Sequence, residues 1–111
     1  MLAYAREQPL EFKATEAGGT VTVVLGGDLD AGNERALRRR LARIMQRRPR
    51  RLVFEMARVG YIDCACARAI VETERSLPAG TRPGIRHPQP VVLRLLRLTG
   101  LDARCDLDLD A

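Results

Sequence analysis

The feature that most constrains the fold of this chain is its alternation of short apolar segments with longer amphipathic ones. Five segments predict strands, because each is short, apolar or β-branched and bounded by turn residues: 10–17, 20–27, 51–57, a short one centred on Ile85, and 103–109. Gly18-Gly19 separates the first two and predicts the turn of a hairpin. The segment around Ile85 is the weakest of the five because two prolines flank it.

Three amphipathic segments predict helices, each ending at a proline or glycine: 33–48, 64–77 and 89–99. The apolar residues of the first recur at the spacing of one helical stripe: Leu37, Leu41, Ile44 and Met45. Asn33 is predicted to cap this helix, with Asp30 as a second candidate for a capping role. In the third helix, Val92, Leu95 and Leu96 are predicted to point inward.

This order of elements predicts an α/β fold with the succession β-β-α-β-α-β-α-β. Strands that alternate with helices imply right-handed crossovers and a largely parallel sheet, to which the first hairpin adds an antiparallel part. The prediction is a single small domain over residues 1–111, with a mixed sheet of about five strands packed with three amphipathic helices. Residues 1–9 are predicted as an N-terminal extension or as part of the first strand.

Composition narrows the classes of protein to which the chain can belong. No apolar run approaches the roughly 20 residues that a membrane span needs. The first residues also lack the basic and then apolar pattern of a secretory signal. The three cysteines, an odd number, favour free thiols in a reducing compartment, so we expect a cytoplasmic protein.

The net charge of +5 is unevenly distributed along the chain. Nine arginines lie from Arg35 to Arg51, and several arginine side chains together could bind the phosphates of a nucleic acid. However, Arg38, Arg39 and Arg40 are successive and fan around a helix, and no aromatic residues interleave with them for base stacking. We interpret this region as a solvated helix face, with an acidic protein partner as the main alternative and nucleic acid as unlikely.

Three stretches occur in an order that resembles a known family: GGDLDAGN at 26–33, RLVFEMARVGYIDCACAR at 51–68, and RHPQPVVLRLLRLTGLD at 86–102. Together they resemble the STAS domain, the fold of bacterial anti-sigma factor antagonists. That family typically shows Gly-Glu-Leu-Asp, then Asp-Ser-Ser-Gly, then Asn-Pro-x-Pro before a helix that ends in Leu-x-Gly-Leu. The resemblance extends from about Leu10 to the end of the chain.

The resemblance implies a regulatory protein in bacterial sigma factor and transcription control. A member of this family docks on an anti-sigma factor that is also a serine kinase of the GHKL type, and phosphorylation of a serine in Asp-Ser-Ser-Gly ends the docking. A phosphoserine adds close to two negative charges, which repel acidic groups of a partner and resist desolvation. The residues that the resemblance places at the docking surface are Asp28, Asp30, Asn33, Asp63, Cys64, Ala65 and Arg68.

The chain departs from the family pattern at the phosphorylated position. Asp63 is retained, but Cys64 replaces the first serine, Ala65 replaces the second and Cys66 replaces the glycine. Neither Cys64 nor Ala65 has a hydroxyl group, so a serine kinase has no acceptor there. We therefore expect that serine phosphorylation does not switch this protein.

The cysteines allow three interpretations. Zinc binding is the weakest, because the spacing of Cys64, Cys66, Cys105 and the sole histidine, His87, does not match zinc sites. Redox sensing by these thiols is the runner-up, since a helix N-terminus lowers a thiol pKa, although Asp63 opposes this effect. The favoured interpretation makes Cys64 a small replacement that cannot be phosphorylated, and makes Cys66 and Cys105 packed core thiols.

Catalysis is not expected. Asp28, Asp30 and Asp63 are predicted to form an acidic rim around Cys64, and only His87 offers a base for that thiol. The glycine pairs lack the lysine of a phosphate-binding loop, so we expect no cofactor and no small-molecule substrate. Besides a redox sensor, the alternative role is a STAS scaffold subunit in a larger signalling or transport assembly.

Overall fold

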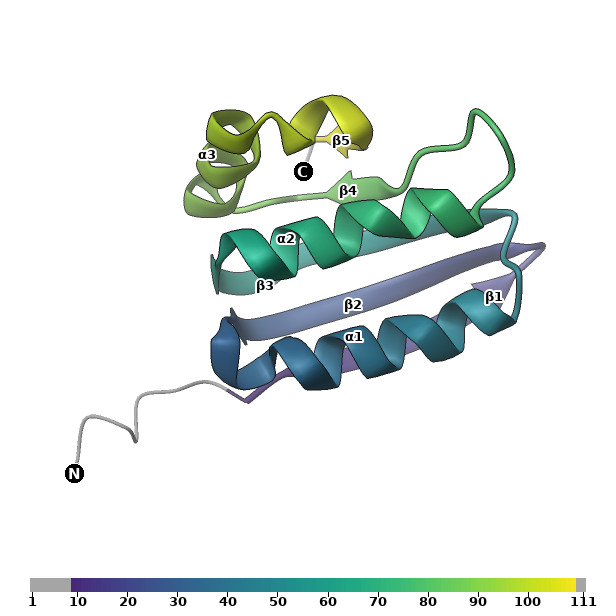
Figure 1. The fold of residues 1–111 in the computed structure, drawn as a ribbon, viewed down its shortest axis with the longest axis horizontal. Helices are drawn as coiled ribbons and strands as arrows, with labels where there is room; N and C mark the ends of the chain where they lie inside the picture. The colour runs from purple at the N-terminus through teal and green to yellow at the C-terminus, as the bar shows by residue number, and fades with distance from the viewer. Residues whose placement is uncertain (1–8, 110–111) are drawn as a thin grey trace.

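The fold is a five-stranded sheet with helices packed on it (Figure 1). The structure is a computed structural model that describes residues 9–109, so the predicted N-terminal extension, apart from Pro9, lies outside the described residues. Its elements follow in the order β1 (Glu11–Ala17), β2 (Thr20–Leu29), α1 (Ala31–Gln46), β3 (Arg51–Ile62), α2 (Cys64–Val71), the 3₁₀ helix η2 (Glu72–Ser76), β4 (Gly84–Arg86), α3 (Pro90–Thr99), the 3₁₀ helix η3 (Leu101–Arg104) and β5 (Asp106–Asp108).

The predicted fold class is confirmed. The strands lie in the order β1-β2-β3-β4-β5, with β1 and β2 antiparallel and every later pair parallel. Helices α1 and α2 run side by side over one face of the sheet (Figure 1). This arrangement brings the carboxyl ends of β2 and β3, and the starts of α1 and α2, to the same end of the molecule.

The hairpin between β1 and β2 depends on its two glycines. Ala17 pairs with Thr20 across the turn, which leaves Gly18 and Gly19 as the two turn residues. Both have positive φ, at 58° and 83°. Two successive positive φ values are typical of the type I′ turn, whose twist matches that of the strands on either side.

The core lies between the sheet and its helices. Val21, Val23 and Leu25 of β2 are fully buried, whereas the alternate residues Thr22 and Val24 are only half-buried. This alternation shows that one face of the strand carries the core and that the other is less covered. The predicted stripe of α1 packs on the covered face through Leu37, Leu41 and Ile44, with Met45 partly buried beside them.

Two predicted strand ends were wrong. Strand β2 continues to Leu29, and β3 continues to Ile62 through a segment predicted as a loop. Polar residues and a glycine make that segment look like a loop in the sequence, although two of its residues, Val59 and Ile62, are buried in the core. Parallel pairing with β2 also continues there past irregularities near Gly26 and Gly27, which the sequence pattern could not indicate.

Three other predicted boundaries also differ. Helix α1 begins at Ala31 with Asp30, one of the two capping candidates, as its cap, and the other candidate, Asn33, lies inside the first turn. The second predicted helix is α-helical only to Val71 and continues as η2. Residues 103 and 104, predicted as strand, belong to η3, which leaves β5 only three residues long.

Candidate functional site

The starts of α1 and α2 form the candidate site, because each follows directly from a central strand. Asp30 is the N-cap of α1, and its carboxylate accepts a hydrogen bond from the backbone N–H of Gly32 at 3.0 Å. Asp63 is the N-cap of α2, and its carboxylate accepts one from the N–H of Cys66 at 2.8 Å. Both aspartates thus satisfy a free amide group of a first helical turn.

Further contacts hold the two helix starts together. The backbone N–H of Asp63 donates to the carbonyl of Leu29 at 2.8 Å. The thiol of Cys66 lies 3.6 Å from the carbonyl oxygen of Asp30. The structure therefore brings Asp30, Asp63 and the adjacent Cys64 to one end of the sheet.

The remaining predicted site residues surround this centre unequally. Cys64 and Ala65 are half-buried in the first turn of α2, and Arg68 is exposed in its next turn. The side-chain amide of Asn33 donates to the carbonyl of Asp28 at 2.6 Å, which ties the start of α1 to the end of β2. Asp28 itself borders a separate hollow of about 270 Å³, whose other lining residues are Glu11, Gly27, Arg58, Gly60 and Gln89.

An exposed apolar groove lies beside Cys64. Its volume is about 300 Å³, and its lining residues come from the end of β3, the start of α2 and the outer side of α3: Tyr61, Ile62, Asp63, Cys64, Val91, Arg94, Leu95 and Leu98. Three of its large side chains are open to solvent, with exposed fractions of 75% for Leu98, 48% for Val91 and 47% for Tyr61. Exposed apolar residues gathered in one hollow are typical of a protein-binding surface.

The contribution of α3 to this groove was missed from the sequence. Val92 and Leu96 are buried as predicted, but Leu95, also predicted to point inward, is only half-buried and lines the groove. The sequence did contain a signal. Six of the ten residues of α3 are Val or Leu, which is more than one inward stripe requires.

A family model described as the STAS domain matches residues 11–110. The chain belongs to the STAS domain family. The match includes every predicted site residue and the whole described sheet. Among curated proteins, none matches the sequence significantly.

Solved structures share this STAS fold at low identity. An anti-sigma factor antagonist from Mycobacterium paratuberculosis superposes with a TM-score of 0.82 at 22% identity, over 91% of this chain and 86% of that one. The anti-sigma factor antagonist SpoIIAA, in its unphosphorylated form, gives a TM-score of 0.73 at 19% identity, over 87% of each chain. RsbS from Moorella thermoacetica, with a serine-to-glutamate substitution, gives 0.66 at 20% identity, over 91% and 88%.

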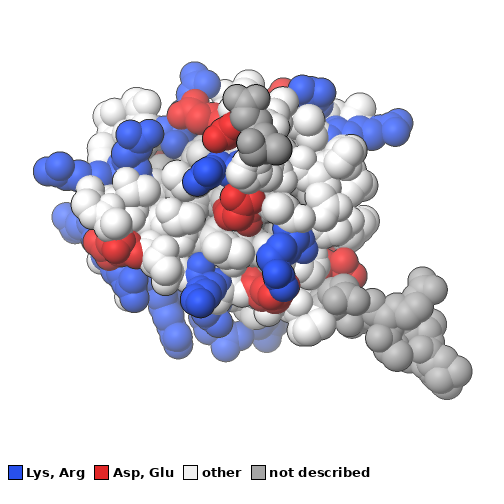
Figure 2. Space-filling view, turned by 180° about the vertical axis from the view of Figure 1, so that it is seen from behind, with Lys and Arg blue, Asp and Glu red and all other residues white. Residues whose placement is uncertain are grey.

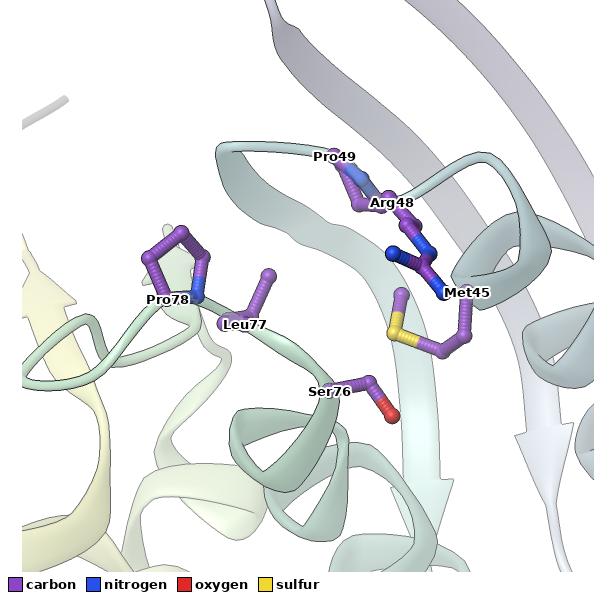
Figure 3. Close-up of a pocket in the computed structure, with 6 residues that line it drawn as sticks. All are labelled: Met45, Arg48, Pro49, Ser76, Leu77 and Pro78. Atoms are coloured by element: carbon purple, nitrogen blue, oxygen red, sulfur yellow. The ribbon is translucent and has the colours of Figure 1, made fainter.

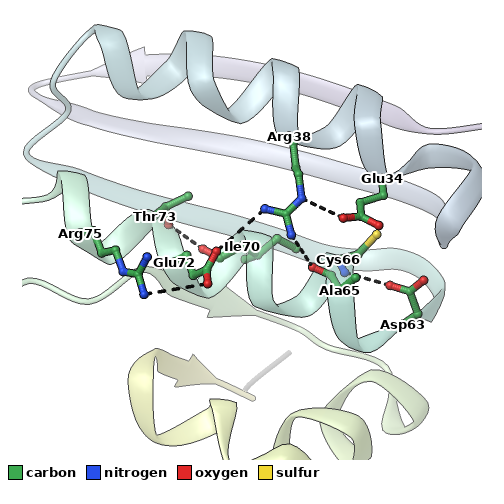
Figure 4. A network of polar contacts seen from close by, with 9 residues as sticks. All are labelled: Glu34, Arg38, Asp63, Ala65, Cys66, Ile70, Glu72, Thr73 and Arg75. Atoms are coloured by element: carbon green, nitrogen blue, oxygen red, sulfur yellow. Dashed lines mark hydrogen bonds and ion pairs between the residues drawn. The ribbon is translucent and has the colours of Figure 1, made fainter.

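An arginine of α1 joins the two helices of this STAS domain beside the site (Figure 4). Arg38 Nε donates to the carboxylate of Glu34 at 2.9 Å, and its guanidinium also reaches the carbonyl of Ala65 at 3.4 Å and a carboxylate oxygen of Glu72 at 3.9 Å. The hydrogen bond to Glu34 raises the pKa of Arg38 above its ordinary value. Arg38 is thus occupied within the domain, and it fixes the first turn of α2 against α1.

The structure favours a packing role for two of the three thiols. Cys66 is fully buried, and burial, followed by the hydrogen bond and charge of Asp63, raises the pKa of its thiol to about 12. Cys105 is also buried, and burial, with the charges of Asp102 and Asp106, raises the pKa of its thiol to about 11. The thiolate is the reactive form of cysteine, so a redox switch at either position is disfavoured.

We expect only one of the three cysteines to react in the folded protein. With iodoacetamide at neutral pH, the intact mass should show a single adduct, mapped by peptide analysis to the half-buried Cys64. After denaturation, all three thiols should be modified. Rapid labelling of Cys66 or Cys105 without denaturant would contradict this assignment and would make the labelled thiol a candidate redox site.

His87 is engaged away from Cys64. Its Nδ1 lies 2.9 Å from a carboxylate oxygen of Glu55, and its backbone adopts a positive φ of 54° in the turn after β4. The base proposed for the Cys64 thiol therefore has another partner. Within residues 9–109, no three or more His, Cys, Asp or Glu side chains come together as a metal site, and no helix is long and apolar enough to span a membrane.

A third hollow lies at the far end of α1 and η2, away from the starts of α1 and α2. It has a volume of about 450 Å³ and is lined by Met45, Arg48, Pro49, Ser76, Leu77 and Pro78 (Figure 3). None of the predicted site residues borders it. Of the hollows described, the groove beside Cys64 is lined by the predicted site residues Asp63 and Cys64, and the hollow at the end of β2 is lined by Asp28.

Proposed function

We propose that this STAS protein is a regulatory binding module that docks on an anti-sigma factor of the GHKL serine kinase type. The observation that carries the proposal is the apolar groove that ends at Cys64. Leu98, Val91 and Tyr61 together expose an apolar surface to solvent. Burial of such side chains is the main source of affinity in a protein interface, with polar groups around it. Asp63 and Arg94 supply charged groups at the groove.

The relatives support this class of partner. The solved structures with this fold include anti-sigma factor antagonists, and SpoIIAA, described as a Bacillus cell fate determinant, has also been solved in a phosphorylated form. A binding role also agrees with the position of His87, because the one histidine considered as a base for Cys64 contacts Glu55 instead.

We further propose that serine phosphorylation does not control this docking. Cys64 begins α2 at the edge of the groove, where an added phosphate would repel an acidic partner group and resist desolvation. Neither Cys64 nor Ala65 has a hydroxyl group to accept that phosphate. The docking surface should therefore keep its charge in the presence of the kinase.

Two measurements test the proposal. Affinity capture from a cytosolic extract of the source organism, followed by mass spectrometry, should recover a GHKL-type kinase with the folded protein. Incubation with that kinase and ATP should leave the intact mass unchanged. A phosphate mapped to residues 61–70 would contradict the absence of phosphorylation, and capture that lacks any kinase of this type would contradict the partner assignment.

A further inference from the structure

A row of arginines occupies the outward side of α1. Arg35, Arg39 and Arg43 lie four residues apart in the helix, and Arg47 continues the row at its C-cap. All four are exposed. Residues four apart form a continuous ridge on a helix surface, and the rise of about 1.5 Å per residue makes this ridge about 18 Å long. We call these four residues the arginine ridge.

The neighbouring arginines do not share this outward position. Arg38 turns toward α2 and is held by Glu34, Glu72 and the carbonyl of Ala65. Arg40 turns toward β1, where it donates to the carbonyl of Phe12 at 2.9 Å and lies 4.7 Å from the centre of its ring. The successive arginines therefore point in different directions, as the sequence predicts. Arg38 and Arg40 make contacts within the domain, whereas Arg39 belongs to the outward ridge.

The arginine ridge is not neutralised within the described part of the domain. Among residues 9–109, the acidic groups in ion pairs contact other arginines or His87, and none contacts the ridge. Like charges four residues apart on a helix repel one another and destabilise it slightly. Basic side chains also gather along the lower edge of the molecule in Figure 2, the edge at which α1 lies in Figure 1.

We propose that the arginine ridge binds an acidic segment of the partner protein, the one whose apolar residues occupy the groove. This inference rests on the proposed function. The start of α1 is held against the start of α2, so the ridge begins near the helix start that borders the groove and runs from there to the far end of α1. A standard interface buries about 800 Å² per partner, so a partner that extends from the groove along α1 would meet the ridge. Guanidinium groups bind carboxylates through two parallel hydrogen bonds, so a run of Asp and Glu complements the ridge.

Other occupants fit less well. The large apolar residues exposed among residues 9–109 are Tyr61, Val91, Leu98 and Leu109, so α1 has no apolar anchor for a membrane surface. The ridge also lacks exposed aromatic side chains on which bases could stack. A second copy of the chain is a poor partner, because its net charge is also +5 and the two copies repel each other.

The test measures binding of a fluorescein-labelled peptide in which glutamate alternates with serine, as long as α1 at 16 residues, by fluorescence anisotropy. The unmodified protein should bind it at low salt and lose affinity as NaCl rises. The double variant Arg39→Glu/Arg43→Glu should bind about tenfold more weakly or worse. The control Arg82→Glu/Arg97→Glu changes two other exposed arginines, alters the net charge equally and should stay within about twofold of the unmodified protein.

Equal losses in the two double variants would overturn the proposal, since general charge attraction would then explain the binding. Tighter binding of a DNA duplex or of vesicles rich in phosphatidylserine, lost only in the ridge variant, would assign the ridge to nucleic acid or membrane. Capture of the kinase separates the two proposals. If Leu98→Glu abolishes capture and the ridge variant does not weaken it, the ridge proposal fails alone. If the ridge variant fails to capture the kinase and Leu98→Glu still captures it, the groove is not the docking surface, and the proposal for the ridge is supported.

Discussion

Replacement of Leu98 by glutamate is expected to weaken partner binding about 30-fold or more, because central interface residues contribute about 2 kcal/mol or more. Leu98 is 75% exposed, so the folded domain gains little from its side chain. A partner that covers the groove would instead have to desolvate a carboxylate where it now meets an apolar side chain, and Arg94, four residues earlier in α3, would offset only part of that cost. Glutamate is also a good helix former, so α3 and the thermal midpoint of unfolding should change little.

The control for this variant is Leu109→Glu. Leu109 is also an exposed leucine, but it does not line the groove. Titration calorimetry with the captured kinase should therefore give a normal dissociation constant for Leu109→Glu and a much weaker one for Leu98→Glu. Equal affinities for the two variants would exclude the groove as the docking surface.

The sequence predicted the parts of this fold that depend on local pattern. The alternation of Leu10, Phe12 and Ala14 with polar residues indicates one buried face in the first strand, and these side chains do pack partly buried against the core. The stripe of Leu37, Leu41 and Ile44 indicates one buried face of α1 and is also correct. The predicted strand at 51–57 is shorter than β3, because most of the final residues of β3 are polar or glycine and are held in the strand by pairing with β2, which is distant in sequence. Pairing between distant segments outweighs local propensity in such strands, and a single sequence does not display it.

The candidate site was predicted only in part, for a related reason. Family resemblance located Asp63 and Cys64, and strand topology then brings them beside Asp30. The apolar surface of α3 could not be joined to them from sequence, because periodicity shows that a helix has apolar residues but not which neighbour leaves some of them exposed. The position of Arg38 between the helices depends on the same packing. Residues 38, 39 and 40 are all arginine, so the sequence does not indicate which of them contacts α2.

Cys64→Ser is expected to create a switch that the present sequence lacks. The serine hydroxyl would stand at the first position of α2, half-buried at the edge of the groove, where the kinase docks in the proposed complex. Transfer of one phosphate adds about 1.5 to 2 negative charges beside Asp63. A helix N-terminus tolerates a phosphate, so the fold should survive, whereas the interface would have to desolvate it. The phosphorylated variant should therefore bind the kinase more than about tenfold more weakly than the unphosphorylated one.

The matched control is Cys64→Ala, which removes the thiol without supplying an acceptor. It should gain no phosphate and should bind the kinase like the unmodified protein, since the thiol of Cys64 has no hydrogen-bond partner within residues 9–109. Intact mass after incubation with kinase and ATP gives the first result, and calorimetry gives the second. If Cys64→Ala loses binding, the thiol itself makes an essential contact. If Cys64→Ser binds the kinase but is never phosphorylated, residue 64 does not occupy the acceptor position, and the reason proposed here for the missing switch is wrong.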